Sequence, residues 1–285
     1  MNPPEYVRAR TVLLDALDGL GPHRDAVILV GAQAVYLHTG DADLATAPTT
    51  TDADLALVPD RLADEPSIVD AMRSAGFVTA GQPGSWLGPG GIAVDLMVPD
   101  ELCGSGGRRS AHLRPPHDDR NTARRTFGLE AAVIDNDLAV ISALGGDDSR
   151  SFEIKVAGPA ALLVSKVIKI VERRHQPQRL KPKDGLDVLR LLRSVDLARL
   201  ARRLRELVSQ PLSRTATEKA MQGLGEHARE PDDLIPVLAA QAELRFTDSD
   251  EIAMSTVTLA GELLHEFDVV GAAGRRGRRV ANVDR

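Results

Sequence analysis

The sequence contains few of the residues that disulfide-linked or zinc-binding proteins need. Its 285 residues include one cysteine, Cys103, which excludes an internal disulfide and a cysteine-rich zinc site. Aromatic residues make up only 3% of the chain, so a core must be built from Ala, Val, Leu and Ile. No apolar run reaches the roughly 18 residues that a membrane-spanning helix requires, and the first residues carry no apolar signal segment. We therefore expect a cytoplasmic protein with no membrane partner.

An excess of positive charge is also lacking, because the formal net charge is −6 at pH 7. A generally basic surface for nucleic acid is thereby excluded. Two stretches are nevertheless locally basic. Residues 108–125 hold six arginines against two aspartates, and residues 166–187 hold seven Lys and Arg residues against three carboxylates. These two stretches are compatible with a polyanionic partner.

The hydrophobic pattern predicts an α+β region followed by a helical one. Helices are predicted at 5–20, 31–40 and 67–77, strands at 26–30, at the D-x-D segment near 52 and at 92–98 and 151–157, a hairpin turning at 135–137, and a mobile loop from 100 to 125. From residue 159 the pattern is helical to about 268. We therefore predict domains at 1–157 and 158–270, and a disordered tail at 271–285.

Three carboxylates carry the chemistry that the sequence suggests. Asp52 and Asp54 lie two residues apart in a strand, so their side chains share a face, and Asp95 lies within the strand at 92–98. Like charges on one face repel, and a carboxylate among apolar neighbours is costly to ionise unless it is paired. A bare D-x-D on a surface is the simpler interpretation. Taken with Asp95, however, the pattern predicts a site for two divalent cations.

Two further features support a phosphate-handling site, and each has a plainer alternative. Gly31 and Ala32 connect the strand at 26–30 to the next helix, where backbone N–H groups can approach a phosphate, although many such turns are only tight connections. Lys166, together with Lys169 and Arg173, lies on one face of a helix, which by itself is typical of a solvated basic face. Asp184, three residues before another aspartate, follows on the next helix.

Together these motifs resemble the nucleotidyltransferase superfamily, whose fold is that of polymerase beta-like enzymes. Within it the chain is most similar to the AbiEii/MenT-type toxin nucleotidyltransferases. That group has a strand, a G-[GS] turn, a D-x-D motif and a third carboxylate. It also has a lysine on a later helix and an [RK]-D-x-x-D-h-x-x-L element, which corresponds here to residues 183–191. The resemblance covers roughly 26–195. The sequence departs from it at Ala32, which lacks a hydroxyl, and at Lys183, which replaces arginine.

The resemblance implies a nucleotidyltransferase-type mixed sheet with flanking helices, followed by an α-helical C-terminal domain. It also implies a Mg²⁺-dependent enzyme (Mn²⁺ is an alternative) that transfers NMP from an NTP to an acceptor hydroxyl and releases pyrophosphate. In the toxin group the acceptor is the 3′ end of tRNA, and a cognate antitoxin is a further expected partner. The runner-up functions are a small-molecule nucleotidyltransferase of the aminoglycoside type and a non-catalytic binding module.

The resemblance also implies a role for each site residue. The metal ligands are Asp52, Asp54 and Asp95, the last of which serves the acceptor hydroxyl. The nucleotide-binding residues are Gly31 and Ala32 through their backbone N–H groups, Lys166 on the triphosphate, and Asp184, which orients Lys166 or the nucleotide. The arginines of 108–125 follow the strand that bears Asp95, so we expect them to contact an RNA acceptor.

Overall fold

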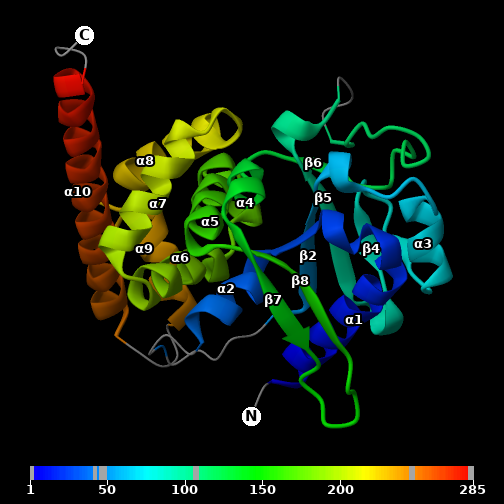
Figure 1. Cartoon of the computed structure of the whole chain (residues 1–285). Helices are drawn as coiled ribbons and strands as arrows, with labels where there is room; N and C mark the ends of the chain where they lie inside the picture. Colours follow the sequence, from blue (N-terminus) through cyan, green and yellow to red (C-terminus); the bar gives the residue numbers. More distant parts are fainter. Residues whose placement is uncertain (1–2, 41–43, 45–49, 105–108, 244–247, 282–285) are drawn as a thin grey trace. The chain divides into compact units, whose positions relative to one another are not determined.

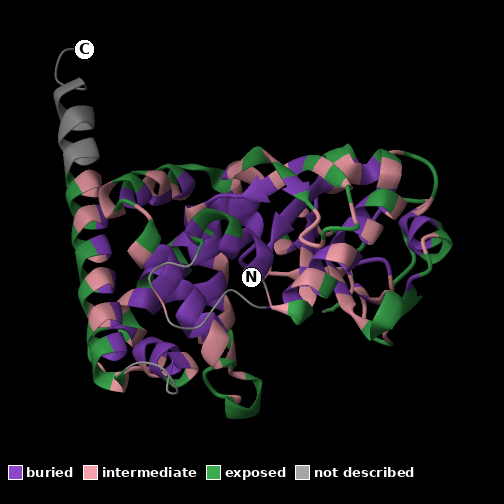
Figure 2. Ribbon diagram, turned by 90° about the horizontal axis from the view of Figure 1, so that it is seen from below, coloured by how far each residue is buried: buried purple, intermediate pink, exposed green. Residues whose placement is uncertain are grey.

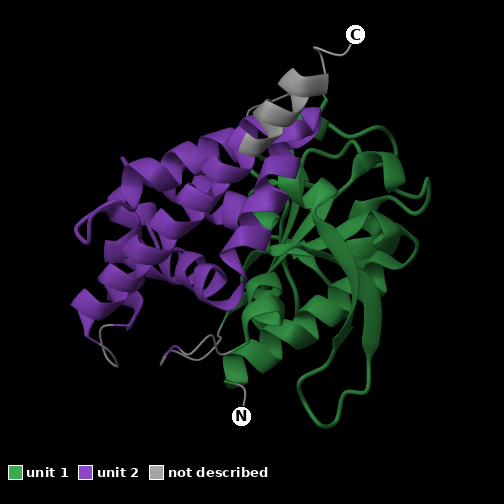
Figure 3. Ribbon diagram, turned by 60° about the vertical axis from the view of Figure 1, so that its left-hand side comes forward, with its two compact units in different colours: residues 1–41, 47–162 green, residues 42–46, 163–285 purple. Residues whose placement is uncertain are grey.

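The computed structural model describes residues 3–40, 44, 50–104, 109–243 and 248–281, with side chains described up to residue 272. Backbone contacts divide the chain into two compact units (Figure 3). Unit 1 comprises residues 1–41 and 47–162, and unit 2 comprises residues 42–46 and 163–285. The division falls after residue 162, whereas the sequence suggested a boundary near residue 157.

Unit 1 is built on a mixed β-sheet. Its strands are β1 (Val27–Val30), β2 (Asp52–Leu57), β3 (Val78–Thr79), β4 (Ser85–Leu87), β5 (Ala93–Pro99), β6 (Arg124–Thr126), β7 (Asn136–Ser142) and β8 (Ser151–Ala157). In the described part of the chain the order is β3-β4-β5-β2-β1-β8-β7, and β6 pairs with β5 off this path. The pairs β2·β5, β1·β8 and β5·β6 are parallel, and the remaining pairs are antiparallel.

The helices of unit 1 pack against this sheet and against each other. They are α1 (Pro4–Leu20), α2 (Gly31–Thr39), α3 (Ile68–Ser74) and α4 (Glu130–Ile134), with 3₁₀ turns at Gly21–Ala26, Pro59–Arg61, Pro89–Gly91 and Asp100–Leu102. The apolar stripe of α1 is fully buried at Leu13, Leu14 and Leu17, and α1 contacts α3, β2 and β5. All four residues of β1 are buried, as are most residues in the middle of the sheet (Figure 2). The aliphatic core predicted from the scarcity of aromatic residues therefore lies between α1 and the central strands.

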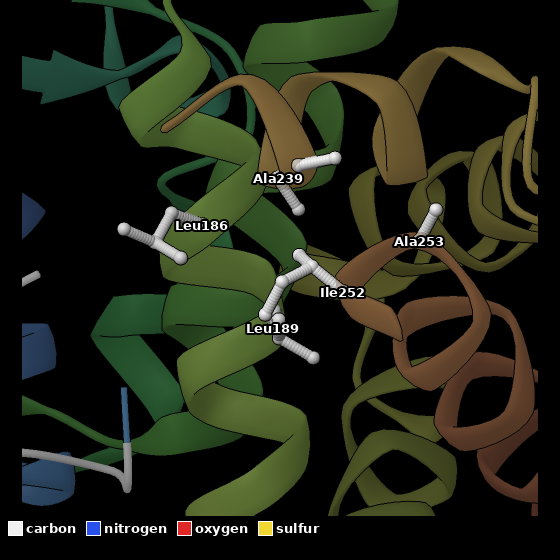
Figure 4. Packing of buried hydrophobic residues seen from close by; sticks show 6 residues of the cluster. Leu186, Leu189, Ala239, Ile252 and Ala253 are labelled. Atoms are coloured by element: carbon white, nitrogen blue, oxygen red, sulfur yellow. The ribbon is translucent and has the colours of Figure 1, made fainter. Parts of the chain in front are cut away.

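Unit 2 is helical. It contains most of α5 (Pro159–Arg173), a 3₁₀ turn at Pro177–Arg179, and α6 (Pro182–Ser194), α7 (Leu197–Ser209), α8 (Pro211–His227), α9 (Leu234–Glu243) and α10 (Ser249–Ala281). A buried cluster joins α6, α9 and α10, and its members are Leu186, Leu189, Ala239, Ala240, Ile252 and Ala253 (Figure 4). Gly185 permits the close approach of α6 to α9, because a Cβ there would lie 2.6 Å from the backbone nitrogen of Ala239.

The predicted hairpin turn at 135–137 is wrong. Residues 130–134 form α4, and β7 begins at Asn136, so the hairpin is instead made by β7 and β8 (Figure 1). Oδ2 of Asp135 accepts a hydrogen bond of 2.9 Å from the backbone N–H of Ala161 in the first turn of α5. Asp135 thus caps a distant helix, and sequence alone does not distinguish this role from a turn.

Two other segments also differ from expectation. The segment predicted to be a mobile loop contains β6 and buried side chains such as His117 and Thr122, although its residues 105–108 lie outside the described part. Helix α10 continues to Ala281, whereas the sequence predicts disorder from residue 271. A formed helix gains one hydrogen bond for each residue added, and this stretch has no proline that would end it. Residues 282–285 of the predicted tail lie outside the described residues.

The predicted fold class is confirmed, because the chain is α+β, with a mixed sheet flanked by helices and a helical region after it. Within the described residues, no helix is long and apolar enough to cross a membrane.

Candidate active site

Two of the three predicted carboxylates lie side by side in the sheet of unit 1. Strand β2 pairs in parallel with β5, and in this register Asp54 is the direct partner of Asp95. Directly paired residues of neighbouring strands point to the same face of the sheet, and the strands are about 4.8 Å apart. The register therefore concentrates two negative charges on one face, where they repel unless a cation lies between them or beside them.

Gly31 brings the start of α2 against Asp54. In the antiparallel pairing of β1 with β2, Val30 is the partner of Asp54, and Gly31 follows at once as the first residue of the helix. Gly31 has φ of +69°, and a Cβ there would overlap the carboxylate of Asp54. Only glycine combines this conformation with such a close approach. The positive end of the α2 dipole therefore lies beside Asp54.

Asp52 is held in a different way. Its Oδ1 accepts a hydrogen bond of 2.6 Å from the Thr50 hydroxyl, and its backbone carbonyl accepts one of 3.1 Å from the side-chain amide of Gln33 on α2. The Gln33 carbonyl oxygen in turn accepts a hydrogen bond of 2.9 Å from the buried Arg10 of α1. Asp52 shares the face of Asp54, but its partner on β5 is Ala93. The D-x-D segment is thus anchored through α2 to α1.

The arrangement differs from the cluster of three carboxylates that the sequence predicts. Across the described residues, no group of three or more His, Cys, Asp or Glu side chains could hold a metal ion. The pair formed by Asp54 and Asp95 still fits Mg²⁺, because this cation is commonly bound by one or two carboxylates together with waters and substrate phosphates. The backbone of Gly31 lies so close to the Asp54 carboxylate that residue 31 has no room for a side chain. We therefore treat Asp54 and Asp95 as the candidate ligands and Asp52 as their neighbour.

Several arginines of the basic stretch are paired with carboxylates. Nη2 of Arg124 lies 3.1 Å from Oδ2 of Asp95, Nη2 of Arg114 lies 3.5 Å from Oδ1 of Asp64, and Arg125 is paired with Asp100. Arg109 and Arg120 are exposed, and Arg108 lies outside the described residues. The charge of this stretch is therefore partly compensated within unit 1, which its sequence alone did not indicate.

In unit 2, Lys166 on α5 lies between two carboxylates of α6. Its Nζ is 2.6 Å from Oδ2 of Asp187 and 3.2 Å from Oδ1 of Asp184. Nζ of Lys169 lies 2.8 Å from the same Asp184 oxygen, and Nη1 of Arg173 lies 3.7 Å from its other oxygen. Burial acts to raise the pKa of Asp184, but the charges of Lys166 and Lys169 outweigh it and lower that pKa to about 2. Asp184 is therefore ionised at neutral pH.

Exposure separates the two lysines. The side chain of Lys166 is 5% exposed, whereas that of Lys169 is 34% exposed. Sequence analysis identified Lys166 and Asp184 as partners, and the structure brings them together. The sequence placed Asp187 three residues after Asp184 but gave it no role, and in the structure Asp187 is fully buried and makes the shorter contact with Lys166. Residues three apart on a helix lie on the same face, so both carboxylates reach the same lysine.

Comparisons with known proteins identify similar solved structures from Helicobacter pylori. No family model matches the sequence, and no curated protein matches it. Among solved structures, the chain is similar to JHP933 from Helicobacter pylori, at 12% identity and a TM-score of 0.45, with 98% of this chain and 100% of that one covered. A second similar structure, described as a "putative nucleotidyltransferase" from H. pylori, has 8% identity and a TM-score of 0.36, with 94% and 99% covered.

Proposed function

We propose that this chain is a Mg²⁺-dependent nucleotidyltransferase that moves a nucleoside monophosphate from an NTP to an acceptor hydroxyl. The observation that carries the proposal is the register of β2 and β5, which makes Asp54 and Asp95 direct partners, with the glycine-opened start of α2 against Asp54. The motifs quoted from the sequence support the same activity. An arrangement of paired carboxylates beside backbone N–H donors suits a phosphate–metal complex.

Within this proposal the residues of unit 1 position the reacting groups. A bound Mg²⁺ would supply neutralisation of the charge that develops on the phosphate oxygens. Asp54 and Asp95 would hold it, and Asp95 would also orient the acceptor hydroxyl. Asp52, fixed through Thr50, would hold water or a second cation. The backbone N–H groups at the start of α2, beginning with Gly31, would donate to a phosphate oxygen, because Val30 before them has no side chain that can cap the helix.

The buried ion network of unit 2 is the second part of the proposal. By resemblance, Lys166 would contact the triphosphate and Asp184 would orient it. The 2.6 and 3.2 Å contacts with Asp187 and Asp184 support the orienting role, because they restrain the ammonium group from two sides. Lys166 would then act as a fixed point charge whose position depends on the two carboxylates.

The acceptor that we propose is the 3′ end of tRNA, with the chain acting as the toxin of a toxin–antitoxin pair. The resemblance of the motifs to AbiEii/MenT-type enzymes supports this assignment. The exposed side chains of Arg109 and Arg120 on unit 1 are available for RNA phosphates. Extension of the 3′ end would block aminoacylation and hence translation.

The test is incubation of the purified protein with each α-labelled NTP, Mg²⁺ and total RNA, followed by gel electrophoresis. We expect label on RNA of tRNA size with wild type and none with Asp54→Asn or Asp95→Asn. Asp137→Asn is the matched control, because Asp137 is an exposed strand carboxylate of the same unit on β7. Labelling that persists in both site variants would refute the carboxylate pair. In a parallel reaction that contains an aminoglycoside, label on the aminoglycoside and on no RNA would overturn the acceptor.

A further inference from the structure

Arg124 brings a positive charge to the carboxylate pair of unit 1. Its Nη2 lies 3.1 Å from Oδ2 of Asp95 and 3.2 Å from Sδ of Met97. In the parallel pairing of β5 with β6, Arg124 is the direct partner of Met97, which lies two residues beyond Asp95 on the same face of β5. Strand register thus places a guanidinium on the face that also carries Asp54.

The backbone of Arg124 is held in place by the core. Gly84 has φ of +73°, and a Cβ there would overlap the carbonyl oxygen of Leu96 and the backbone nitrogen of Arg124. The Gly84 carbonyl accepts a hydrogen bond of 2.7 Å from the Leu96 N–H. The indole N–H of Trp86, a fully buried side chain, donates to the carbonyl of Thr122 at 3.3 Å. The segment that leads into Arg124 is therefore fixed against β5, and the contact with Asp95 follows from a packed backbone.

We propose that Arg124 competes with the divalent cation for Asp95 and moves to the triphosphate when cation and nucleotide arrive together. This inference rests on the proposed function, because it takes Asp54 and Asp95 as the metal-binding pair. A guanidinium and a divalent cation both seek carboxylate oxygens, and one positive charge beside the pair weakens its attraction for a second cation. The Arg124 side chain is 39% exposed, so it has room to turn away from Asp95.

A triphosphate offers Arg124 another partner. Guanidinium groups can bind phosphate oxygens through two parallel hydrogen bonds. The contact of Arg124 with Asp95 uses only one nitrogen, Nη2. When a cation arrives already bound to a triphosphate, Arg124 can leave Asp95 without losing an anionic partner. The carboxylate pair therefore discriminates between two ligands: it binds the cation alone weakly and the cation–triphosphate complex well. Arg124 thereby couples metal binding to nucleotide binding.

The experiment measures the binding of Mn²⁺ alone, by electron paramagnetic resonance, and of the Mn²⁺–tripolyphosphate complex, which carries no base. Wild type is compared with Arg124→Gln, which removes the charge, and with Arg124→Lys, which keeps it. The matched control is Arg125→Gln, because Arg125 is the next residue of β6 and is paired with Asp100. Thermal unfolding verifies that each variant is folded. Asp95→Asn, alone and combined with Arg124→Gln, reports whether the cation bound is the one at Asp95.

We expect Arg124→Gln to bind Mn²⁺ about tenfold more tightly, equal to about 1.4 kcal/mol, and to bind the tripolyphosphate complex more weakly than wild type. A purely structural role would not move the two affinities in opposite directions. Arg125→Gln should stay close to wild type in both, whereas Arg124→Lys should keep the weak Mn²⁺ affinity but bind the tripolyphosphate complex more weakly, because an ammonium lacks the two parallel donors. Unchanged Mn²⁺ affinity in Arg124→Gln, with Asp95→Asn abolishing binding, would overturn this inference and leave the proposed function standing. Mn²⁺ binding that is insensitive to Asp95→Asn in every background would overturn both.

Discussion

Replacement of Lys166 by alanine tests the buried ion network of unit 2. Within the described part of the chain, Lys166 is the only cation paired with Asp187, at 2.6 Å, and Asp187 is fully buried. Asp184 would keep Lys169 at 2.8 Å and Arg173 at 3.7 Å. The main penalty therefore falls on Asp187, which is left as an uncompensated buried charge. Removal of one partner from a buried pair costs about 3–5 kcal/mol.

The assay is urea unfolding followed by far-ultraviolet circular dichroism at pH 7. Lys169→Ala is the matched control, with an expected loss below about 1 kcal/mol, because its side chain is 34% exposed and Asp184 keeps Lys166. The double variant Lys166→Met/Asp187→Leu should recover most of the loss, since an apolar pair of similar volume often replaces a buried ion pair without cost. A loss below about 1 kcal/mol for Lys166→Ala would refute the reasoning.

Turnover of the same variants separates catalysis from folding. At temperatures where both single variants are folded, we expect Lys166→Ala to lower transfer far more than Lys169→Ala. Equal losses would indicate that the lysines act as a diffuse positive field. Normal transfer by the folded double variant would show that Lys166 has only a structural role.

Three further predictions concern backbone, pH and salt. Gly31→Ala should destabilise unit 1 by more than the roughly 1–3 kcal/mol that an alanine costs in a left-handed backbone conformation. It should also weaken Mn²⁺ binding, because the added Cβ would overlap the carboxylate of Asp54. Gly40→Ala, with φ of +52° and open space around its Cβ, isolates the backbone cost, so equal melting temperatures would contradict the overlap. The pKa of Asp184 is lowered from 3.8 to about 2, so the ionised carboxylate should contribute about 2 kcal/mol to the free energy of unfolding. This contribution should be complete above pH 4 and lost as pH falls toward 2. Urea unfolding at each pH measures it, and Asp184→Asn should abolish the pH dependence. Arg109→Ala/Arg120→Ala should weaken tRNA binding and flatten its salt slope while NTP affinity stays constant, and an unchanged slope would exclude these side chains from the RNA contact.

Local patterns predicted the elements that carry the candidate site. The run at 26–30 and the helix after it appear as β1 and α2, and the alternation around Asp95 appears as β5. Period-two alternation is a property of any extended strand, so the shared face of Asp52 and Asp54 followed from their spacing. The short strands β3 and β6, of two and three residues, left too little pattern to be recognised.

The sequence by itself therefore determined which residues share a face of one strand or one helix, because such faces depend only on local geometry. Only the tertiary structure decided that Asp54 lies opposite Asp95, that Arg124 reaches the same carboxylate, and that Lys166 is enclosed by Asp184 and Asp187. Strand register and burial arise from contacts between segments far apart in the chain. A shift of one residue in register would place Asp95 on the other face of the sheet, and no local pattern records that choice.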